Sequence, residues 1–402
     1  MKKEYSSYRI CLYPDFVFGK GKTAEVGKLV KEHGGTKVLI VGYGADLLPE
    51  LYGIVRKALE EEGIAYVEIP GVVANPRRSL VNKAVELAKS ENIDFIVALG
   101  GGSVIDSAKA IAYAKNYDGE WWDFYTRKAS PKKEDRVPVG AINTISASGS
   151  ETSKASVILD DIDTMKKIGV ATEFGRPVFA IEDPVNTYSV PAFQTGCGSV
   201  DILAHTFDCY FTPRFCALGD EFDEGLMRNT VRYAPIAYND PTNYEARAEL
   251  MLTCSFCHND IATLGRERHG GGTAGAHDLE FISEVYDKPH GAGLAIIMPH
   301  ILEWYVEGSA DTCAKVARFA NQVFGVPVDF DDMKITAYEG IRRFRNWLKS
   351  MGMPSTLSEL GITDPDAPQK LCDAVHYEKD GTYSCFYPMT KADVLNFFKE
   401  LV

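Results

Sequence analysis

Hydrophobic and polar positions along this chain follow two different periods, and the period changes near Pro191. Before Pro191, short apolar runs rich in β-branched residues alternate with amphipathic stretches, which predicts strands that alternate with helices. The predicted strands are 37–42, 65–69 and 95–99, and the predicted helices are about 47–62 and 80–90. This alternation is typical of a parallel sheet with crossover helices. We therefore predict an α/β domain over residues 1–190.

After Pro191 the periodicity is helical almost throughout, and turn signals such as Asn239-Asp-Pro-Thr-Asn243 separate the segments. We predict an all-α domain over residues 191–402. A chain of 402 residues with 45% hydrophobic content is ample for two cores. Because the sequence shows no internal repeat and no long flexible linker, we expect the two halves to pack directly and to leave a cleft between them.

Composition and charge narrow the class of protein. A formal net charge of −13 without a clustered basic stripe argues against nucleic acid or an anionic membrane as the main partner. No apolar run reaches the roughly 18 residues of a membrane span, and the first residues lack the apolar core of a secretion signal. Nine cysteines, an odd number in mostly apolar surroundings, indicate reduced thiols. We expect a cytoplasmic, enzyme-sized protein.

One cysteine pair permits a different interpretation. Cys254-Ser-Phe-Cys257-His258 matches the pattern for covalent attachment of a c-type haem. The motif lies within a continuous helical pattern in a chain without a predicted signal peptide, whereas haem attachment needs export and an axial partner. We therefore interpret these cysteines as core residues and keep the haem protein as a rival hypothesis, which a Soret band would reveal.

Two polar loops follow predicted strands of the first half. The strand 95–99 runs directly into Gly100-Gly-Gly-Ser-Val-Ile-Asp-Ser-Ala-Lys109, where glycines permit close backbone approach and a helix start offers amide donors to an anion. A glycine turn that serves only tight packing is the alternative, because this is neither the Walker sequence nor the spaced dinucleotide fingerprint. The second loop, Asn143 to Glu151, is rich in hydroxyl groups. Together the two loops predict one nucleotide site.

The turn after the strand 37–42 bears on the choice of cofactor. It contains Gly44 and Asp46. An acidic residue here would accept hydrogen bonds from a ribose hydroxyl and repel a 2′-phosphate, which favours NAD(H) slightly over NADP(H). The alternative is that Asp46 caps a helix that begins at Leu47, because aspartate is a preferred N-cap.

Four side chains of the second half offer oxygen and nitrogen donors for a metal ion. Residues four apart in a helix lie on one face, so the helical pattern over 198–211 places Asp201 and His205 side by side. A surface hydrogen bond would explain that pair alone about as well. His290 follows a proline at a predicted helix start, and His277 heads another amphipathic run. Divalent iron or zinc accepts such a set without a thiolate.

Segments spread over almost the whole chain resemble the iron-containing (group III) alcohol dehydrogenases, and particularly their butanol-dehydrogenase-like branch. Their order along the chain makes the resemblance specific, although no single segment would suffice. The segments are Asn75-Pro, Gly100 to Lys109, Thr144 to Glu151, Pro177-Val-Phe-Ala-Ile-Glu-Asp-Pro, the Asp201/His205 helix, Tyr286-Asp-Lys-Pro-His-Gly with Leu294-Ala-Ile, and Met353 to Ile362.

The resemblance implies a dehydroquinate synthase-like architecture, with an α/β dinucleotide-binding domain, a helical metal-binding domain, and the metal and nicotinamide meeting in the cleft. It implies that Gly101, Gly102 and Ser103 hold the pyrophosphate and that Asp106 lies near the nicotinamide. It also implies that Thr144, Ser148 and Lys166 line the cofactor on the opposite side, and Asn75 belongs to one of the matching segments. Gly44 and Asp46 are cofactor candidates from their own turn and not from the resemblance, because relatives of this branch often have Gly-Gly-Gly-Ser there. The metal ligands carried over are Asp201, His205, His277 and His290.

By the same resemblance, the chain is expected to transfer hydride between a nicotinamide cofactor and a small primary alcohol or aldehyde of the butanol type. Divalent iron is the expected metal, with zinc or manganese as alternatives, and a homodimer is the expected assembly. Besides the haem protein, two rival functions remain: a glycerol- or diol-type metal-dependent dehydrogenase, and a nucleotide- and metal-binding protein without turnover.

The chain departs from the family pattern between His277 and His290. Members of this branch usually carry a second histidine four residues after the ligand that corresponds to His277, and it is usually discussed as part of a proton relay. A one-residue deletion would explain the spacing in this chain, and it leaves Phe281 or Glu280 at the place of that companion histidine. His269, beside three glycines, is an alternative ligand.

Overall fold

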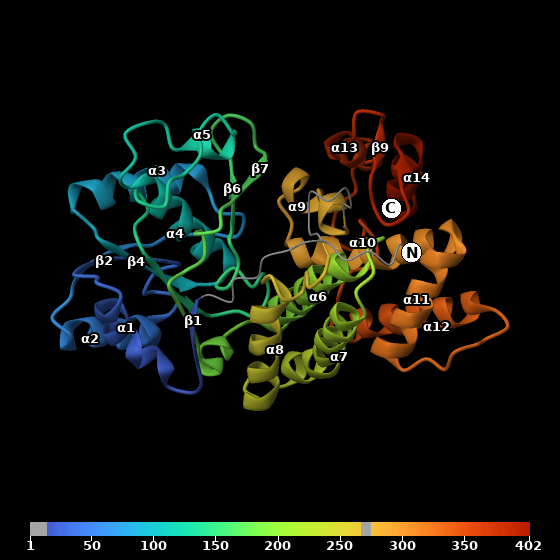
Figure 1. The fold of residues 1–402 in the computed structure, drawn as a ribbon, viewed down its shortest axis with the longest axis horizontal. Helices are drawn as coiled ribbons and strands as arrows, with labels where there is room; N and C mark the ends of the chain where they lie inside the picture. The colour runs from blue at the N-terminus through green and yellow to red at the C-terminus, as the bar shows by residue number, and fades with distance from the viewer. Residues whose placement is uncertain (1–13, 267–274) are drawn as a thin grey trace. The chain divides into compact units, whose positions relative to one another are not determined.

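The structure is a computed structural model that describes residues 14–266 and 275–402. The chain forms two compact units, of which one ends at Val190 and the other begins at Pro191. The first unit has the predicted α/β fold and the second is helical (Figure 1). His269, the alternative metal ligand, lies outside the described residues.

A six-stranded sheet with entirely parallel pairing forms the first unit, in the order β1-β8-β5-β4-β2-β3. The prediction of a parallel sheet is therefore confirmed, and two predicted strands have the observed bounds. The strands are β1 (Asp15–Phe18), β2 (Lys37–Gly42), β3 (Ala65–Ile69), β4 (Phe95–Gly100), β5 (Val139–Asn143) and β8 (Phe179–Glu182).

Helices cover both faces of this sheet, which is why its central strands read as continuous apolar runs. Val38 and Ile40 of β2 pack in a cluster with α1 and α2, whereas Leu39 and Val41 pack in a second cluster with α3 and α4. The helices are α1 (Val26–Glu32), α2 (Pro49–Glu61), α3 (Arg78–Ser90), α4 (Gly102–Ala114) and α5 (Trp122–Tyr125), with 3-10 turns η1 (Lys22–Glu25) and η2 (Pro184–Thr187).

A separate antiparallel pair, β6 (Ala155–Leu159) and β7 (Lys167–Ala171), follows the second predicted cofactor loop. The β6 strand contacts α4. At this contact the main-chain N–H of Val157 donates to a carboxylate oxygen of Asp106 at 2.9 Å. The pair therefore connects the end of the loop to the helix that begins at the first predicted cofactor loop.

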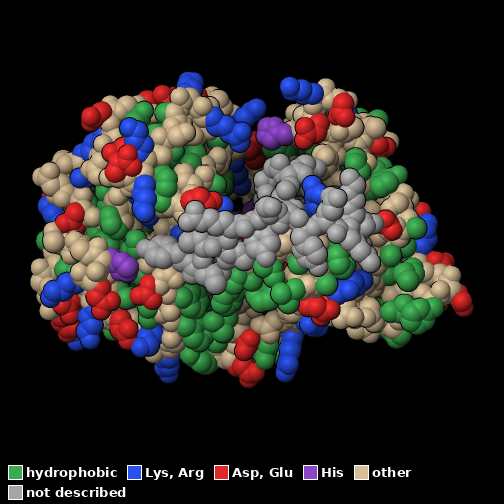
Figure 2. All heavy atoms as spheres, in the orientation of Figure 1, with side chains coloured by type: hydrophobic (Ala, Val, Ile, Leu, Met, Phe, Trp, Pro, Cys, Tyr) green, Lys and Arg blue, Asp and Glu red, His purple; other side chains and the backbone are tan. Residues whose placement is uncertain are grey.

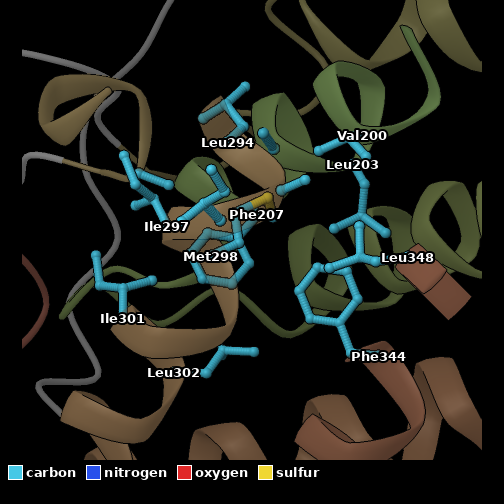
Figure 3. Close-up of a cluster of buried hydrophobic side chains, with 14 of the residues drawn as sticks. Val200, Leu203, Phe207, Leu294, Ile297, Met298, Ile301, Leu302, Phe344 and Leu348 are labelled. Carbon is cyan, nitrogen blue, oxygen red and sulfur yellow. The ribbon is translucent and has the colours of Figure 1, made fainter. Parts of the chain in front are cut away.

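The second unit has its core between α6, α10 and α12. Figure 3 shows that Val200 and Leu203 of α6, Leu294 and Ile297 of α10, and Phe344 of α12 belong to one buried cluster. The helices are α6 (Ala192–Tyr210), α7 (Ala217–Asn239), α8 (Tyr244–Cys257), α9 (Ile282–Val285), α10 (His290–Gly308), α11 (Ala310–Phe324), α12 (Met333–Ser350), α13 (Ala367–Ala374) and α14 (Lys391–Glu400), with the 3-10 turn η3 (His277–Leu279).

The all-α prediction needs one addition. Strands β9 (Thr382–Tyr383) and β10 (Met389–Thr390) form a short antiparallel pair. Two residues are too few for an alternating pattern to be recognised in a sequence.

Among the described residues, no helix is long and apolar enough to cross a membrane. On the face shown in Figure 2, acidic and basic side chains are interspersed over the described surface.

The segment after His277 differs from its prediction. Instead of one amphipathic helix, it forms the 3-10 turn η3 and the four-residue helix α9. The physical reason is that side chains take over the main-chain donors, which interrupts a helical ladder. Asp208 accepts from the N–H of Ala276 at 2.6 Å, and Glu280 accepts from the N–H of Ser283 at 2.8 Å.

Candidate metal centre and nucleotide-binding edge

The metal centre predicted from the sequence starts on α6, where Asp201 and His205 are both buried. Asp201 Oδ1 lies 3.4 Å from His277 Nε2 and 3.9 Å from His290 Nε2. One ligand atom from each of these three residues lies within 4.8 Å of the other two. The structure therefore brings together a carboxylate and two imidazoles that face one point, as binding of one cation requires.

His205 lies beside this group and is not one of the three. Its Nδ1 is 2.7 Å from the main-chain oxygen of Asp201, one turn earlier, and 3.3 Å from Asp201 Oδ1. Its ring centroid is 4.3 Å from that of His277 and 4.2 Å from that of His258. His205 thus contacts the group through its ring. The structure also places His258 next to the predicted ligands, a neighbour that the sequence marked only as part of the haem pattern.

Burial argues against the haem hypothesis. Cys254 and Cys257 have no exposed surface and belong to the core cluster of the helical unit. The Cys257 thiol lies 3.1 Å from the main-chain oxygen of Cys254, within α8. All eight described cysteines are free and buried, in agreement with the prediction of reduced thiols. Covalent attachment of a haem would need both thiols at the surface.

Carboxylates contact the far sides of the two imidazoles that face Asp201. His277 Nδ1 lies 2.6 Å from Asp208 Oδ2, and Asp208 belongs to α6, as Asp201 does. His290 Nδ1 contacts Glu280 Oε2. Of the two residues that could replace the companion histidine, Glu280 is therefore the one that contacts a predicted ligand, His290. The ring of Phe281 lies 5.8 Å from that of His376 instead.

The electrostatics of the group favour positive charge at its centre. Burial by itself would raise the pKa of Asp201, but the neighbouring imidazoles, His205 first, lower it well below its usual value. Burial by itself would lower the pKa of His277, but Asp208 and Asp201 raise it to about 10. A proton on His277 supplies the positive charge. A site that attracts a proton this strongly, with one oxygen and two nitrogen donors, fits a divalent cation.

The predicted pyrophosphate loop lies where β4 ends and α4 begins, at the carboxyl edge of the sheet. A Cβ on Gly101 would lie 2.2 Å from Ile145 Cγ2, and a Cβ on Gly102 would lie 2.2 Å from Ser148 Oγ. The missing side chains therefore let the two predicted loops touch. Ser103 lies in the first turn of α4, where main-chain N–H groups lack helical partners and can bind an anion. Thr144 is buried at the end of β5.

The β2 end of the same edge carries two tyrosine hydroxyls. Tyr43 Oη accepts from the Gly101 N–H at 3.2 Å, and Tyr52 Oη accepts from the Gly44 N–H at 3.1 Å. Gly44 has a φ of 122°, which favours glycine. Asp46 is exposed in the following turn. The capping alternative for Asp46 is wrong, because α2 begins at Pro49 and its N-cap is Leu48.

Asp106 and Lys109 connect α4 to the second loop. Asp106 accepts from the Ser150 hydroxyl at 2.5 Å. Lys109 Nζ is fully buried and donates to the main-chain oxygens of Ser150, Ser153 and Ala155 at 2.7 to 2.9 Å. Burial lowers the pKa of Lys109 to about 8, although Asp106 opposes this. The two charged residues therefore fix the loop that carries Ser148, a role that the sequence did not reveal.

The remaining predicted cofactor residues lie in turns. Asn75 adopts a φ of 56° in the connection from β3 to α3, at the same edge of the sheet. Lys166 is exposed in the turn between β6 and β7, in the separate two-stranded sheet. The structure thus brings Gly101, Gly102 and Ser148 together and leaves Lys166 outside the six-stranded sheet.

A parallel sheet with glycine turns at its carboxyl edge, in one chain with a helical unit whose carboxylate and imidazoles could hold a cation, is an arrangement that fits a metal- and nucleotide-dependent oxidoreductase. The model of the iron-containing alcohol dehydrogenase family matches residues 14–184, and the model of the C-terminal region of the Fe-containing alcohol dehydrogenase family matches residues 195–402. The chain belongs to the iron-containing alcohol dehydrogenase family. It is therefore a metal- and nicotinamide-dependent alcohol dehydrogenase and aldehyde reductase.

Relatives along the whole chain support this assignment. The chain is 35% identical to NADH-dependent butanol dehydrogenase A of Clostridium acetobutylicum, over 95% of this chain and 96% of the relative. It is 29% identical to the NADPH-dependent aldehyde reductase YqhD of Escherichia coli, over 88% of this chain and 89% of the relative. The crystal structure of NADH-dependent butanol dehydrogenase A from Thermotoga maritima is similar, with a TM-score of 0.91, 31% identity and complete coverage of both chains.

Proposed function

We propose that this enzyme reduces small straight-chain aldehydes such as butyraldehyde with NADH, and oxidises the corresponding primary alcohols, with divalent iron as its metal. The observation that carries the proposal is the convergence of His277 Nε2 and His290 Nε2 on Asp201 Oδ1 in a chain of this family. Two relatives whose names specify NADH and butanol support the choice of cofactor and substrate.

The helical unit, residues 191–402, would hold the cation through Asp201, His205, His277 and His290. When bound, the cation supplies Lewis-acid polarisation of the substrate oxygen. Asp208 fixes the ring of His277 from behind, and the ring of His290 contacts Glu280 in the same way. These contacts hold the imidazoles in place before a ligand arrives, so the site needs little reorganisation.

The α/β unit, residues 1–190, would hold the nicotinamide nucleotide at the carboxyl edge of its sheet. The main-chain N–H groups of Gly101, Gly102 and Ser103 would bind the pyrophosphate, because they lie at the start of α4. Thr144 and Ser148 would contact the nucleotide from the second loop. The remaining residues proposed for the cofactor are Gly44, Asp46, Asn75, Asp106 and Lys166.

Asp46 is a second support for the choice of NADH. Its carboxylate is exposed in the turn after β2, and it does not cap α2. A carboxylate at the end of this strand would accept from a ribose hydroxyl and would repel a 2′-phosphate. Asp46→Asn should narrow the difference in KM between NADH and NADPH, and an unchanged ratio would contradict the assignment.

The test is an anaerobic assay of NADH and NADPH oxidation with butyraldehyde, on protein that is loaded with ferrous iron, zinc or manganese or stripped by a chelator. We expect turnover that disappears on stripping and returns with ferrous iron. Oxidation of glycerol or 1,2-propanediol much faster than butanol would instead identify a diol-type dehydrogenase. Absence of turnover under every loading would indicate a binding protein without catalysis.

A matched pair of variants tests the metal ligands. His205→Ala should abolish metal retention and leave NADH binding intact. His300→Ala is the control, because His300 Nδ1 contacts the main-chain oxygen four residues earlier, as His205 Nδ1 does. The ring of His205 lies beside that of His277, whereas the ring of His300 lies near that of Phe397. Equal metal content in both variants would exclude His205 as a ligand.

We also infer that the enzyme works in the cytoplasm as a homodimer. The eight described thiols are reduced and buried, which agrees with a reducing compartment. Light scattering of the purified protein at several concentrations checks the dimer, and a monomeric mass at every concentration would contradict it.

A further inference from the structure

The Glu280 carboxylate is buried and hydrogen-bonded, unlike the exposed carboxylates that keep a protein soluble. Its side chain has no exposed surface. Oε1 accepts from the Ser283 N–H at 2.8 Å, and Oε2 accepts from the Ser283 hydroxyl at 2.6 Å. The remaining contact of Oε2 is with His290 Nδ1. Three donors therefore hold a buried negative charge directly behind one of the proposed metal ligands.

The neighbouring helix leaves room for this carboxylate. A Cβ on Gly293, in the first turn of α10, would lie 2.1 Å from Glu280 Oε1. Any side chain there would displace Glu280 or α10. Because His290 begins the same helix, glycine at position 293 permits Glu280 and His290 to come into contact.

We propose that Glu280, one of the two residues that stand at the place of the family's companion histidine, is the positioning residue for His290. By accepting a hydrogen bond from Nδ1–H, the carboxylate fixes the ring tautomer in which Nε2 is unprotonated and faces Asp201 Oδ1. Its buried charge also strengthens Nε2 as a donor to a cation. This role rests on the proposed function, because it requires that His290 binds a metal.

A second contact of the same kind supports this assignment. Asp208 approaches His277 Nδ1 from α6, so each of the two imidazoles that face Asp201 has a carboxylate on its other nitrogen. The two carboxylates come from different elements and make separate hydrogen bonds. A chance contact would not explain the same arrangement twice in one site.

The test compares Glu280→Ala and Glu280→Gln with the wild type in the full-length protein. Affinity for Co²⁺ and Zn²⁺ is measured by competition with a chelator, and the visible absorption of the Co²⁺ protein reports ligand geometry. We expect an affinity about 10- to 100-fold weaker for Glu280→Ala, together with a changed Co²⁺ spectrum. Glu280→Gln keeps the size and one acceptor oxygen, so it should lose less affinity than Glu280→Ala.

Glu284→Gln is the control. It makes the same change of residue type four positions later, on α9, and should leave the metal affinity and the Co²⁺ spectrum unchanged. Wild-type affinity and spectrum in Glu280→Gln and Glu280→Ala would overturn the role of Glu280. If Glu280→Ala does not fold, a wild-type affinity and spectrum in Glu280→Gln is sufficient to overturn it. A wild-type protein that binds neither metal would overturn the proposed function, and this role with it.

Discussion

A histidine between two carboxylates makes the stability of the metal-free protein depend on pH. Asp208 and Asp201 face His277 and raise its pKa from 6.5 to about 10, and the rings of His205 and His290 also lie beside it. The folded protein therefore binds this proton more tightly than the unfolded chain does. The resulting stability is fully present below pH 6.5 and is lost as the pH rises through 10.

We expect the free energy of unfolding of the metal-free protein to be lower at pH 9 than at pH 6.5. Urea unfolding at the two pH values measures the difference. Asp208→Asn should reduce the pH dependence, because the pKa of His277 is then raised less. With metal bound, the protein should keep its stability at pH 9, since the cation replaces the proton. A metal-free protein equally stable at both pH values would contradict this account.

Tyr43 is a second residue with a measurable consequence. Its hydroxyl accepts the Gly101 N–H, which is one of the groups proposed to bind the pyrophosphate. Tyr43→Phe should free that donor and lower the KM for NADH by about two- to fivefold, a change within the range of one neutral hydrogen bond. Tyr52→Phe is the matched control at Gly44. A raised KM in Tyr43→Phe would show that the hydroxyl itself holds the nucleotide.

At the scale of elements, the packing of α10 against α6 brings His290 close to Asp201. A Cβ on Gly291 would lie 2.1 Å from the main-chain oxygen of Cys197. Gly291→Ala should therefore separate the two helices, lower the free energy of unfolding by about 1–3 kcal/mol and weaken metal binding. Denaturant unfolding and chelator competition measure both effects.

The control for this prediction is Gly53→Ala in α2, where nothing lies within 4 Å of the added Cβ. Alanine is the better helix former at such a position, so this variant should gain about 0.5–1 kcal/mol. If Gly291→Ala were as stable as Gly53→Ala, the two helices would tolerate a wider separation than their contact suggests.

The sequence predicted helices and strands well where the apolar positions follow one period. It predicted them poorly where side chains form hydrogen bonds with the main chain. Buried strands such as β2 and β4 are nearly continuous apolar runs, and Pro289 marks the start of α10. The segment after His277 has helical periodicity, yet main-chain N–H groups around it donate to side chains. One acceptor is Asp208, which is distant in the sequence, and the other is Glu280, which lies within the segment. Whether Glu280 or Phe281 faces His290 depends on the turn that results, so the pattern alone left both open.

At the scale of the whole molecule, metal and nucleotide should protect different parts of the chain. Hydrogen exchange with mass spectrometry, with each ligand added alone, measures this. Metal should slow exchange in α6, η3 and the start of α10, whereas NADH should slow exchange around 100–106 and 144–151. A ligand bound by the folded state stabilises the region that it contacts. Metal protection confined to the α/β unit would contradict the assignment of the ligands.

The sequence also predicted the organisation of the whole chain, because the change of period at Pro191 coincides with a change of fold class. It could not predict the contacts that hold each site. Lys109 binds three main-chain oxygens of the loop from Ser150 to Ala155, and such contacts depend on the three-dimensional path of both segments. His258 lies beside His205 for the same reason.

The separation of the proposed ligands along the chain also constrains how the enzyme would acquire a metal. His277 and Asp201 are 76 positions apart and meet only after α6 has packed against the segments that follow it. The nascent chain offers at most the local pair Asp201 and His205, which is too few donors to select an ion. Metal insertion should therefore follow folding, and the ion acquired should reflect which metals are available to the completed protein. Synthesis in cells grown with different metal supplies should accordingly yield the same fold with different metal contents.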